Sequence, residues 1–343
     1  MERKRPTAYD VARLAGVSQS MVSRAFTDGA SISAQAKERV LAVAKSLSYR
    51  PNMIARSLIT QRSRLIGVAM SYMENQFYPT VLEELSREFA VHGYRVLLFT
   101  PGADGNPDPL LDEILRFQVA AVVLASVRMT SHFAEECAQV NVPVLLFNRR
   151  TSNQAVSSVT GQNIVGGRTI GSFLLAGGHE RFAFVAGLED SSTSQEREEG
   201  FGAALQAAGK KTYRREVGYY DFSAAQTAAR RLFSSRERPD AVFCANDHTA
   251  IAVMGVAQSE FGLRVGEEVS IVGFDDVALA AWPSFQLTTY SQPVQTMSQR
   301  TVQLVQAFVE GRLTTPVHDI VAGELMIRRS ARRPGNDWKP PAA

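Results

Sequence analysis

The chain of 343 residues lacks the features of several large protein classes. Its two cysteines, Cys137 and Cys244, are too few and too far apart for a disulfide scaffold or a zinc site, so we expect two reduced core thiols. No run of about 18 apolar residues occurs, which argues against a membrane span and a membrane partner. The first ten residues are basic and then polar, without the apolar stretch of a secretory signal, and we expect a cytoplasmic protein.

The sequence also lacks common enzyme motifs. There is no Walker A loop, no HExxH or GxSxG motif and no cluster of metal ligands. Asp275 and Asp276 could be taken for a pair of glycosidase acids, but adjacent residues at the end of a strand point in different directions. We therefore expect a protein that is not an enzyme and needs no cofactor.

Positive charge is concentrated at one end of the chain. The formal net charge is +3, yet residues 1–64 contain 12 Lys and Arg against 4 Asp and Glu, a net charge of +8. The remaining residues contain 25 against 30, a net charge of −5. A basic N-terminal module on a slightly acidic body favours a polyanionic partner at that end, although a solvated basic arm would show the same charges.

Residues 7–47 have the pattern of three short helices. Thr7, Ser18 and Ser33 are the expected N-caps, and Gly16 breaks the first helix because glycine tolerates a positive φ. Two helices joined by a glycine-containing turn within about 20 residues describe a helix-turn-helix. The outer side of the second helix carries groups suited to base edges and phosphates, namely Gln19, Ser20, Ser23 and Arg24.

The body from Arg64 onward has a different pattern. Short apolar runs alternate with amphipathic segments of helical length, which predicts parallel sheets joined by right-handed crossovers. A restart near Asn163 indicates two similar α/β halves. Residues 331–343 are polar and rich in proline, so we expect a flexible tail. The expected strands are 65–70, 95–99, 120–125, 142–147, 181–187, 240–245 and 269–274, and the expected helices are 78–91, 108–117, 131–140, 163–176, 194–208, 223–235 and 247–261.

Several motifs, in order along the chain, resemble those of the lactose repressor (LacI/GalR) family of transcription regulators. TAYDVARLAGVSQSMVSRAF resembles the family's DNA-binding signature and SYRPNMIARSL its hinge, while CANDHTA, VSIVGFDD and LTTYSQP resemble its sensor domain. The resemblance implies an N-terminal all-α helix-turn-helix domain and a two-lobed α/β domain with parallel sheets, similar to a periplasmic binding protein. The implied boundaries are 1–50 for the helix-turn-helix, 51–63 for the hinge, 64–330 for the sensor, about 64–161 and 293–321 for lobe 1, and about 162–290 and 322–330 for lobe 2.

The resemblance assigns DNA contacts to the N-terminal module. Gln19, Ser20 and Arg24 fall at base-reading positions of the second helix. Arg24 is the main candidate because arginine can bind guanine O6 and N7 through two hydrogen bonds, and a phosphate contact is its alternative role. Contacts with the DNA backbone or groove are implied for Thr7, Tyr9, Ser18, Ser23 and Tyr49.

The resemblance also implies a hinge that orders on DNA, because residues 52–59 would form a helix too short to be stable alone. One hinge helix from each protomer would pack over the minor groove. Leu58 would then be an apolar wedge between base steps, with a core leucine as the alternative. Asn52 would lie against the minor groove and Ala55 against the paired hinge.

A two-lobed α/β body binds ligands at the carboxyl ends of its strands. The polar and aromatic candidates near these ends are Ser71, Tyr72, Phe77, Asn148, Arg149, Arg197, Asn246, Asp275, Trp282 and Gln292. Of these, the resemblance assigns Arg197, Asn246, Asp275 and Gln292 to the effector site. Asp247 is instead expected to cap a helix, and Trp282 has loop packing as its alternative role.

These amide, carboxylate, guanidinium and aromatic groups suit a polyhydroxylated ring, so we expect a sugar or sugar derivative as the effector. Asn148 stands where many relatives carry aspartate, and with Arg149 and Arg197 present an acidic sugar derivative is a further hypothesis. A nucleobase or another metabolite in the same fold is the alternative. A periplasmic-type sugar-binding protein is the alternative from another class, and the basic helix-turn-helix argues against it.

The expected mechanism is a two-state switch in which a homodimer binds a near-palindromic double-stranded operator. Effector binding would re-angle the lobes and change the spacing of the two hinges. Repression relieved by the effector is preferred, and corepressor-dependent or activating regulation is the alternative. The C-terminal tail has no leucine heptads for a tetramerising helix, which predicts a dimer.

Overall fold

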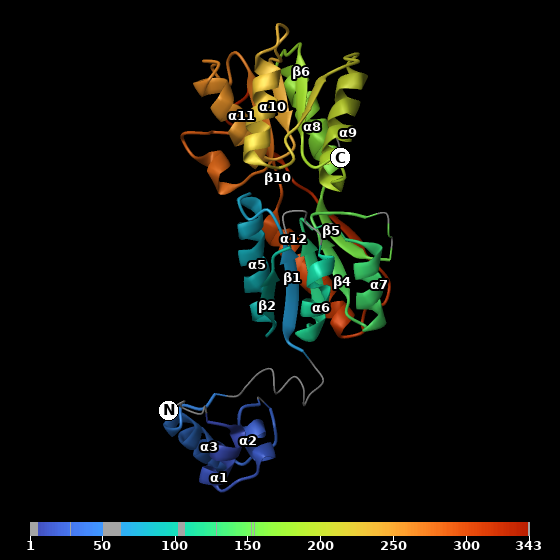
Figure 1. The fold of residues 1–343 in the computed structure, drawn as a ribbon. Coiled ribbons are helices and arrows are strands. Elements are labelled where there is room, and N and C mark those ends of the chain that lie inside the picture. Colours follow the sequence, from blue (N-terminus) through green and yellow to red (C-terminus); the bar gives the residue numbers. More distant parts are fainter. Residues whose placement is uncertain are drawn as a thin grey trace. The chain divides into compact units, whose positions relative to one another are not determined.

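The computed structural model describes residues 6–27, 29–50, 63–101, 107–127, 129–151, 153 and 155–341. These residues fall into two compact units that divide between Ser63 and Arg64 (Figure 1). No helix in the described ranges is long and apolar enough to cross a membrane.

The smaller unit contains the three predicted helices, α1 (Ala8–Ala15), α2 (Gln19–Ala25) and α3 (Ala34–Ser46). Each begins at its predicted cap, because the side-chain oxygens of Thr7, Ser18 and Ser33 accept hydrogen bonds from the backbone three residues later. Gly16 ends α1 with a φ of 64°, which costs glycine no strain. Val11, Val22 and Val40 fill the centre of the bundle and are at most 1% exposed.

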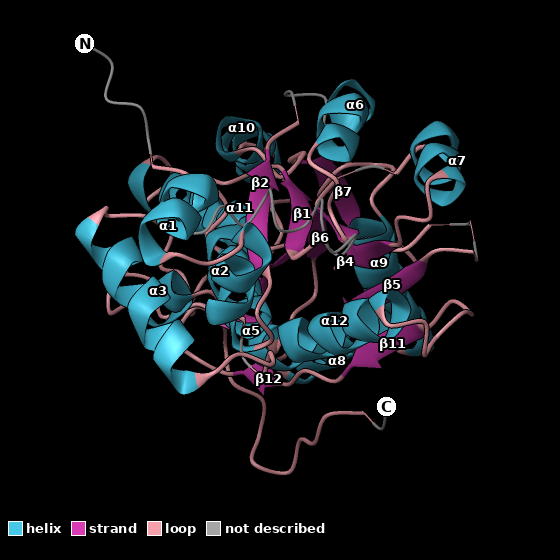
Figure 2. Ribbon diagram, turned by 90° about the horizontal axis from the view of Figure 1, so that it is seen from below, coloured by secondary structure: helices cyan, strands magenta, loops and turns pink. Residues whose placement is uncertain are grey.

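The larger unit contains two six-stranded sheets, each in its own lobe. The sheet of the first lobe has the spatial order β11-β5-β4-β3-β1-β2 and all of its strand pairs are parallel. Helices α5 (Phe77–Val91) and α12 (Val294–Val309) cover one face, and α6 (Asp108–Arg116) and α7 (Ser131–Gln139) cover the other (Figure 2). The strands are β1 (Leu65–Met70), β2 (Arg95–Phe99), β3 (Ala121–Ala125), β4 (Val144–Phe147), β5 (Ser157–Gly161) and β11 (His318–Val321).

The sheet of the second lobe has the order β12-β10-β9-β8-β6-β7 and is parallel except for β12, which pairs antiparallel with β10. Helices α8 (Asn163–Ala176) and α9 (Ser192–Ala207) pack on one face, with α10 (Phe222–Phe233) and α11 (Asp247–Ser259) on the other. A short 3-10 helix, η1 (Ala278–Ala281), follows β9. The strands are β6 (Phe182–Ala186), β7 (Arg214–Val217), β8 (Ala241–Cys244), β9 (Ser270–Asp275), β10 (Thr288–Ser291) and β12 (Leu325–Met326).

The expected strands and helices of the body are all present, with ends that differ by at most two residues. Their continuous apolar runs are explained by burial on both faces, as in β3 and β6, where every residue is buried. Both cysteines are free and buried, and burial raises the pKa of the Cys137 thiol to about 11. The list of expected elements lacks strands β5, β7, β10, β11 and β12 and helix α12.

The chain passes between the lobes three times, after β5, after β10 and after β11. Residues 331–343 were predicted to form a flexible tail, and two of the described tail residues contact the second lobe. Arg332 donates its backbone N–H to Ser270 Oγ at 2.8 Å, and Trp338 Nε1 donates to Ser172 Oγ at 3.3 Å. The Trp338 ring also packs edge-on against Phe173, with centroids 5.5 Å apart. The partly buried Trp338 ring thus adds apolar contact to the core of the second lobe.

Candidate DNA-reading surface and effector cleft

The polar residues of α2 that were predicted to contact DNA lie on its exposed side. Val22 and Ala25 are turned into the core of the smaller unit at 1% and 3% exposure, which places the residues between them outward. Within the described ranges Arg24 has no carboxylate partner, so its guanidinium is available to an external acceptor. The exposed residues of this surface are Ser18, Gln19, Ser20, Ser23 and Arg24.

The other residues predicted to contact DNA differ in their exposure and in the contacts they already make within the protein. Thr7 is exposed, but its hydroxyl donates to Asp10 Oδ2 at 2.7 Å within the capping box. Tyr9 is 60% exposed. Tyr49 is half-buried and packs edge-on against Phe26, with centroids 6.0 Å apart, so it also supports the small core. Asn52, Ala55 and Leu58, with the hinge around them, lie outside the described residues.

The two lobes of the larger unit meet at a polar cleft. The first lobe contributes Tyr72, Asn75, Phe77, Tyr78, Asn148 and Arg149, and the second contributes Thr193, Arg197, Tyr220, Asn246 and Asp275. Seven of the predicted effector residues therefore lie together, namely Tyr72, Phe77, Asn148, Arg149, Arg197, Asn246 and Asp275.

Backbone strain gathers at the same place. Eleven described residues other than glycine have a positive φ, and seven of them lie at or just after the carboxyl end of a strand. Such angles cost about 1–3 kcal/mol each and persist where surrounding contacts hold them, which is typical of functional sites. The seven residues are Tyr72, Ser126, Asn148, Tyr219, Tyr220, Asp275 and Asp276.

Arg197 is the best-held group of the cleft. Its side chain is 2% exposed, and its guanidinium carbon lies 3.7 Å from the centroid of the Phe274 ring. Nε donates to Asn163 Oδ1 at 3.0 Å, and Nη1 donates to the carbonyl oxygen of Ala245 and lies 3.5 Å from Asp275 Oδ1. Nη2 is buried and has no hydrogen-bond partner among the described residues. One nitrogen of a rigidly held cation is thus left for a ligand.

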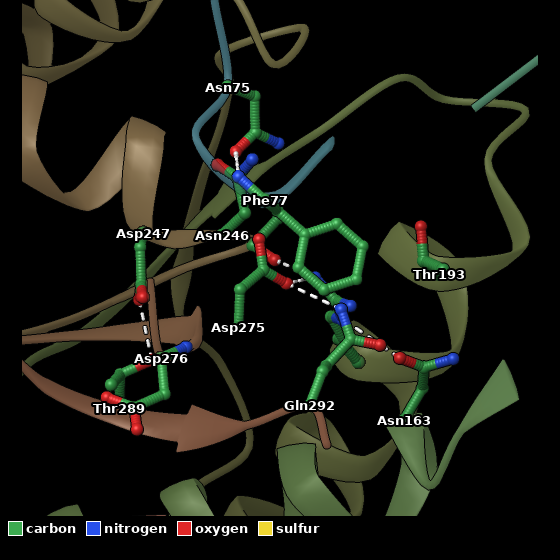
Figure 3. Close-up of polar contacts among 12 residues, drawn as sticks. Asn75, Phe77, Asn163, Thr193, Asn246, Asp247, Asp275, Asp276, Thr289 and Gln292 are labelled. Atoms are coloured by element: carbon green, nitrogen blue, oxygen red, sulfur yellow. Dashed lines mark hydrogen bonds and ion pairs between the residues drawn. The ribbon is translucent and has the colours of Figure 1, made fainter. Parts of the chain in front are cut away.

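Asp275 is positioned by two neighbours. Gln292 Nε2 donates to Asp275 Oδ1 at 2.7 Å (Figure 3). Arg197 Nη1 lies 3.5 Å from the same oxygen atom. Burial raises the pKa of Asp275 to about 6, although Arg197 and the hydrogen bond from Gln292 lower it. At neutral pH the group is therefore mainly a carboxylate that accepts hydrogen bonds. Gln292 lies behind this carboxylate and does not itself line the cleft.

The predicted capping role of Asp247 belongs to its neighbour. Asn246 Oδ1 accepts the backbone N–H of Thr249 at 2.9 Å and is the N-cap of α11. Asp247 is fully buried and binds the Val277 N–H at 2.9 Å and the Thr289 hydroxyl at 2.6 Å (Figure 3). It therefore ties α11 to β10 and to the turn after β9. Because the cap occupies only the carbonyl oxygen of Asn246, its amide nitrogen is not committed to the helix.

Two predicted residues lie away from the central cleft. Ser71 is buried next to a second cavity, which Tyr72 borders as well. Trp282 is 54% exposed at the end of η1 and does not line the cleft, so its placement in the effector site is corrected to the loop role.

The sequence missed several residues that the cleft contains. Asn75 Oδ1 accepts the backbone N–H of Phe77 at 3.2 Å at the start of α5, and Tyr78 follows it (Figure 3). Burial raises the pKa of Tyr78 to about 12, so its hydroxyl stays protonated. On the opposite lobe the Thr193 and Tyr220 hydroxyls lie 3.1 Å apart. A tyrosine pair directly after a short strand is the signal that would have located Tyr220.

Comparison with known proteins agrees with both units. Residues 7–52 match the family model "Bacterial regulatory proteins, lacI family", and residues 172–331 match the model "Periplasmic binding protein-like domain". The transcriptional regulator CelR of Thermobifida fusca is 31% identical over 338 residues, covering 96% of this chain and 99% of CelR. The probable transcriptional repressor ExuR of Bacillus subtilis (strain 168) is 28% identical over 335 residues, covering 95% of this chain and 98% of ExuR.

Solved structures show the same architecture. A lac repressor dimer bound to operator and the anti-inducer ONPF has a TM-score of 0.85 at 26% identity, with 95% of this chain and 99% of that chain covered. A complex of the regulator CelR with cellobiose has a TM-score of 0.72 at 28% identity, with coverage of 95% and 100%. With its helix-turn-helix and its two-lobed sensor, this chain is a DNA-binding transcription regulator that belongs to the lacI family of bacterial regulatory proteins.

Proposed function

We propose that this regulator is a cytoplasmic repressor, without enzymatic activity, whose affinity for DNA is controlled by a sugar or sugar derivative bound between the two lobes. The observation that carries the proposal is that buried polar atoms without partners face the cleft from both lobes. Arg197 Nη2 in the second lobe and Asn148 Oδ1 in the first have no hydrogen-bond partner within the described part of the chain.

Such atoms are expensive to leave unpaired. A buried donor or acceptor without a partner costs about 1–3 kcal/mol, and almost all such groups in folded proteins are paired. A ring with several hydroxyls would pair the donor of Arg197 and the acceptor of Asn148 at once. Phe77 and Tyr78, at 2% and 8% exposure, supply apolar faces beside these polar groups.

A ligand that contacts both lobes can set the angle between them. The lobes already touch at the rim of the cleft, where the Arg150 backbone N–H donates to Ser192 Oγ at 2.9 Å and the Arg150 guanidinium lies 3.7 Å from Glu196. Effector binding adds differential contacts to this closed arrangement and so shifts the equilibrium between lobe angles. Through the hinge at 51–63, that shift controls how the module at 1–50 meets DNA.

The relatives support the same scheme. One solved neighbour holds cellobiose, and another is a dimer on operator DNA. We therefore propose a homodimer that binds a near-palindromic operator through the exposed side of α2, with Arg24 reading a base. The proposed lobes comprise about 64–161 with 293–321, and about 162–290 with 322–330.

A thermal-shift panel of the full chain tests the sugar effector. Neutral sugars, sugar acids, sugar phosphates and nucleobases are compared at a common concentration. A ligand at 100 times its Kd stabilises the native state by about 2.7 kcal/mol. We expect at least one sugar or sugar derivative to raise the melting temperature, and stabilisation by nucleobases alone would contradict the proposal.

A further inference from the structure

We infer that the effector is a sugar bearing one carboxylate, and that Arg149 is the residue that binds this charged group. The inference rests on the proposed sugar effector and names its chemical class. Arg149 is a buried cation that no described residue neutralises.

Arg149 is only 8% exposed, yet it forms no ion pair with any residue that the structure describes, and its Nε is buried without a hydrogen-bond partner there. Two other arginines of the larger unit, by contrast, are paired with carboxylates. Arg215 lies 2.7 Å from Glu189, and Arg328 lies 2.7 Å from Asp276. A buried charge without a counterion costs several kcal/mol. Arg149 therefore lacks an anion that a ligand can supply.

The charges of the cleft also do not balance. Its lining contains two guanidinium groups, Arg149 and Arg197, and one carboxylate, Asp275. Arg197 lies 3.5 Å from Asp275, so these two charges offset each other and one positive charge remains. Asn148 beside Arg149 is an amide and adds no negative charge. A ligand with one negative charge neutralises the cleft, whereas a phosphate monoester carries about −1.5 to −2 at pH 7 and exceeds it.

The position of Arg149 shows where the anionic group would lie. Arg149 lines the central cleft and also the polar cavity beside it, which is bordered by Arg150 and Glu196. Arg150 lies 3.7 Å from Glu196, and Glu196 also accepts from Asn163 Nδ2 at 2.9 Å. Asp190 in the same cavity has a partner of its own. Arg149 is thus the uncommitted cation at this end, and its planar fork matches a carboxylate through two parallel hydrogen bonds.

Isothermal titration of the full chain tests the inference with matched pairs of ligands. Galacturonate and glucuronate are compared with galactose and glucose, and glucose 6-phosphate is included as the phosphate probe. The proteins are wild type, Arg149→Gln, Arg149→Lys and Arg230→Gln. Arg230 is a surface residue that lies 2.7 Å from Glu260 and does not line the cleft. Arg230→Gln therefore controls for the loss of one positive charge elsewhere on the protein.

We expect one of the two acids to bind wild type at least about 10-fold more tightly than its neutral parent, since a charge-assisted pair contributes about 1.5–3 kcal/mol. Arg149→Gln should lose about 10-fold or more of the affinity for that acid, Arg149→Lys should regain part of it, and Arg230→Gln should bind as wild type does. Melting curves of each variant establish that it is folded before titration.

Three results would overturn the inference. Neutral sugars binding as tightly as the acids would remove the anionic class and leave the sugar effector standing. Tighter binding of glucose 6-phosphate than of either acid would replace the carboxylate by a phosphate. If folded Arg149→Gln lost affinity for the acid and for its neutral parent by the same factor, Arg149 would have only a structural role. If none of the sugars bound, and none stabilised the chain in the wider thermal-shift panel, the proposed sugar effector would fail as well.

Discussion

Gly167 on α8 lies directly against the backbone of Arg197 on α9, so that a Cβ atom at position 167 would be 2.1 Å from the Arg197 carbonyl oxygen. Gly200 makes the reciprocal contact, because a Cβ there would be 2.0 Å from the carbonyl oxygen of Ile164. These two glycines let α8 and α9 approach closely, and this approach brings Asn163 within 3.0 Å of the Arg197 side chain. The position of Arg197 in the cleft therefore depends on the lack of a side chain at Gly167 and at Gly200.

Gly167→Ala should destabilise the larger unit and weaken effector binding. Neither helix backbone can yield to a methyl group without moving Arg197, and overpacking of this kind costs about 1–3 kcal/mol. Gly255→Ala on α11 is the matched control, since a Cβ there meets nothing within 4 Å, and it should raise the free energy of unfolding by about 0.5–1 kcal/mol. Urea unfolding of both variants measures the difference. Equal behaviour of the two would show that the α8–α9 contact is not tight.

Arg24→Ala should weaken binding to a specific operator by about 1–3 kcal/mol while the melting of the sensor is unchanged. Arg24→Lys separates the two roles of this side chain. Lysine keeps the charge but not the two-pronged donor pattern, so it should fail to restore specific binding if Arg24 reads a base. The measurement is fluorescence anisotropy with a duplex selected by the protein from a random pool and with a scrambled duplex. Full rescue by lysine would indicate a phosphate contact.

The unliganded protein should become more stable through Asp275 as the pH falls from 7 to 5. Burial raises the pKa of Asp275 in the folded state to about 6, above its ordinary value of 3.8, so the folded protein takes up the proton first. The resulting stability is complete below the unfolded pKa and is lost as the pH rises through the folded one. Arg197, Gln292 and Asp247 face this carboxyl, and burial and Asp275 raise the pKa of Asp247 well above its ordinary value.

The expected gain is about 1 kcal/mol in the free energy of unfolding between pH 7 and pH 5, relative to an Asp275→Asn variant. The comparison with the variant removes contributions from other titrating groups, including His179 and His248. Parallel pH profiles of the two proteins would show that the pKa of Asp275 is not raised.

The two tryptophans of the chain should respond differently to truncation. Trp338→Ala removes the ring contact with Phe173 and the hydrogen bond to Ser172, and we expect a loss of about 2 kcal/mol. Trp282→Ala removes a side chain that is 54% exposed, so its effect should stay within about 0.5 kcal/mol. Differential scanning calorimetry of both variants measures this. A larger loss for Trp282→Ala would contradict the packing of the tail described above.

The sequence predicted the elements that are marked by a continuous apolar run, a helical period or a cap residue. Strands such as β3 and β6 are continuous apolar runs, and the caps Thr7, Ser18 and Ser33 have the residue types that helix starts require. It missed β5 (SSVTG) because its buried residues are mostly small and polar, and β7 (RREV) because an edge strand needs few apolar residues. The helix α12 went unrecognised because no side-chain cap marks its start after Pro293.

The same reasoning explains which cleft residues were found. Asn148, Arg149, Asn246 and Asp275 end apolar strands, so the topology rule alone places them at the cleft. Tyr220 was missed together with the strand that precedes it. Trp282 was included among the effector residues because it follows the VSIVGFDD motif. The sequence alone does not indicate whether the loop that carries it faces the cleft. The unpaired state of Arg149 depends on side-chain positions around it, which no linear pattern records.

The response of operator binding to the effector, in wild type and in Asp275→Ala, tests most directly whether the cleft controls DNA binding. A duplex selected by the protein is titrated by fluorescence anisotropy with and without the sugar that stabilises wild type in the thermal-shift panel. We expect the sugar to change the wild-type Kd by about 5–150-fold, which corresponds to about 1–3 kcal/mol of coupling. Asp275→Ala should bind the duplex as wild type does without the sugar and should no longer respond to it. A variant that responds as strongly as wild type would show that the effector does not act through this cleft.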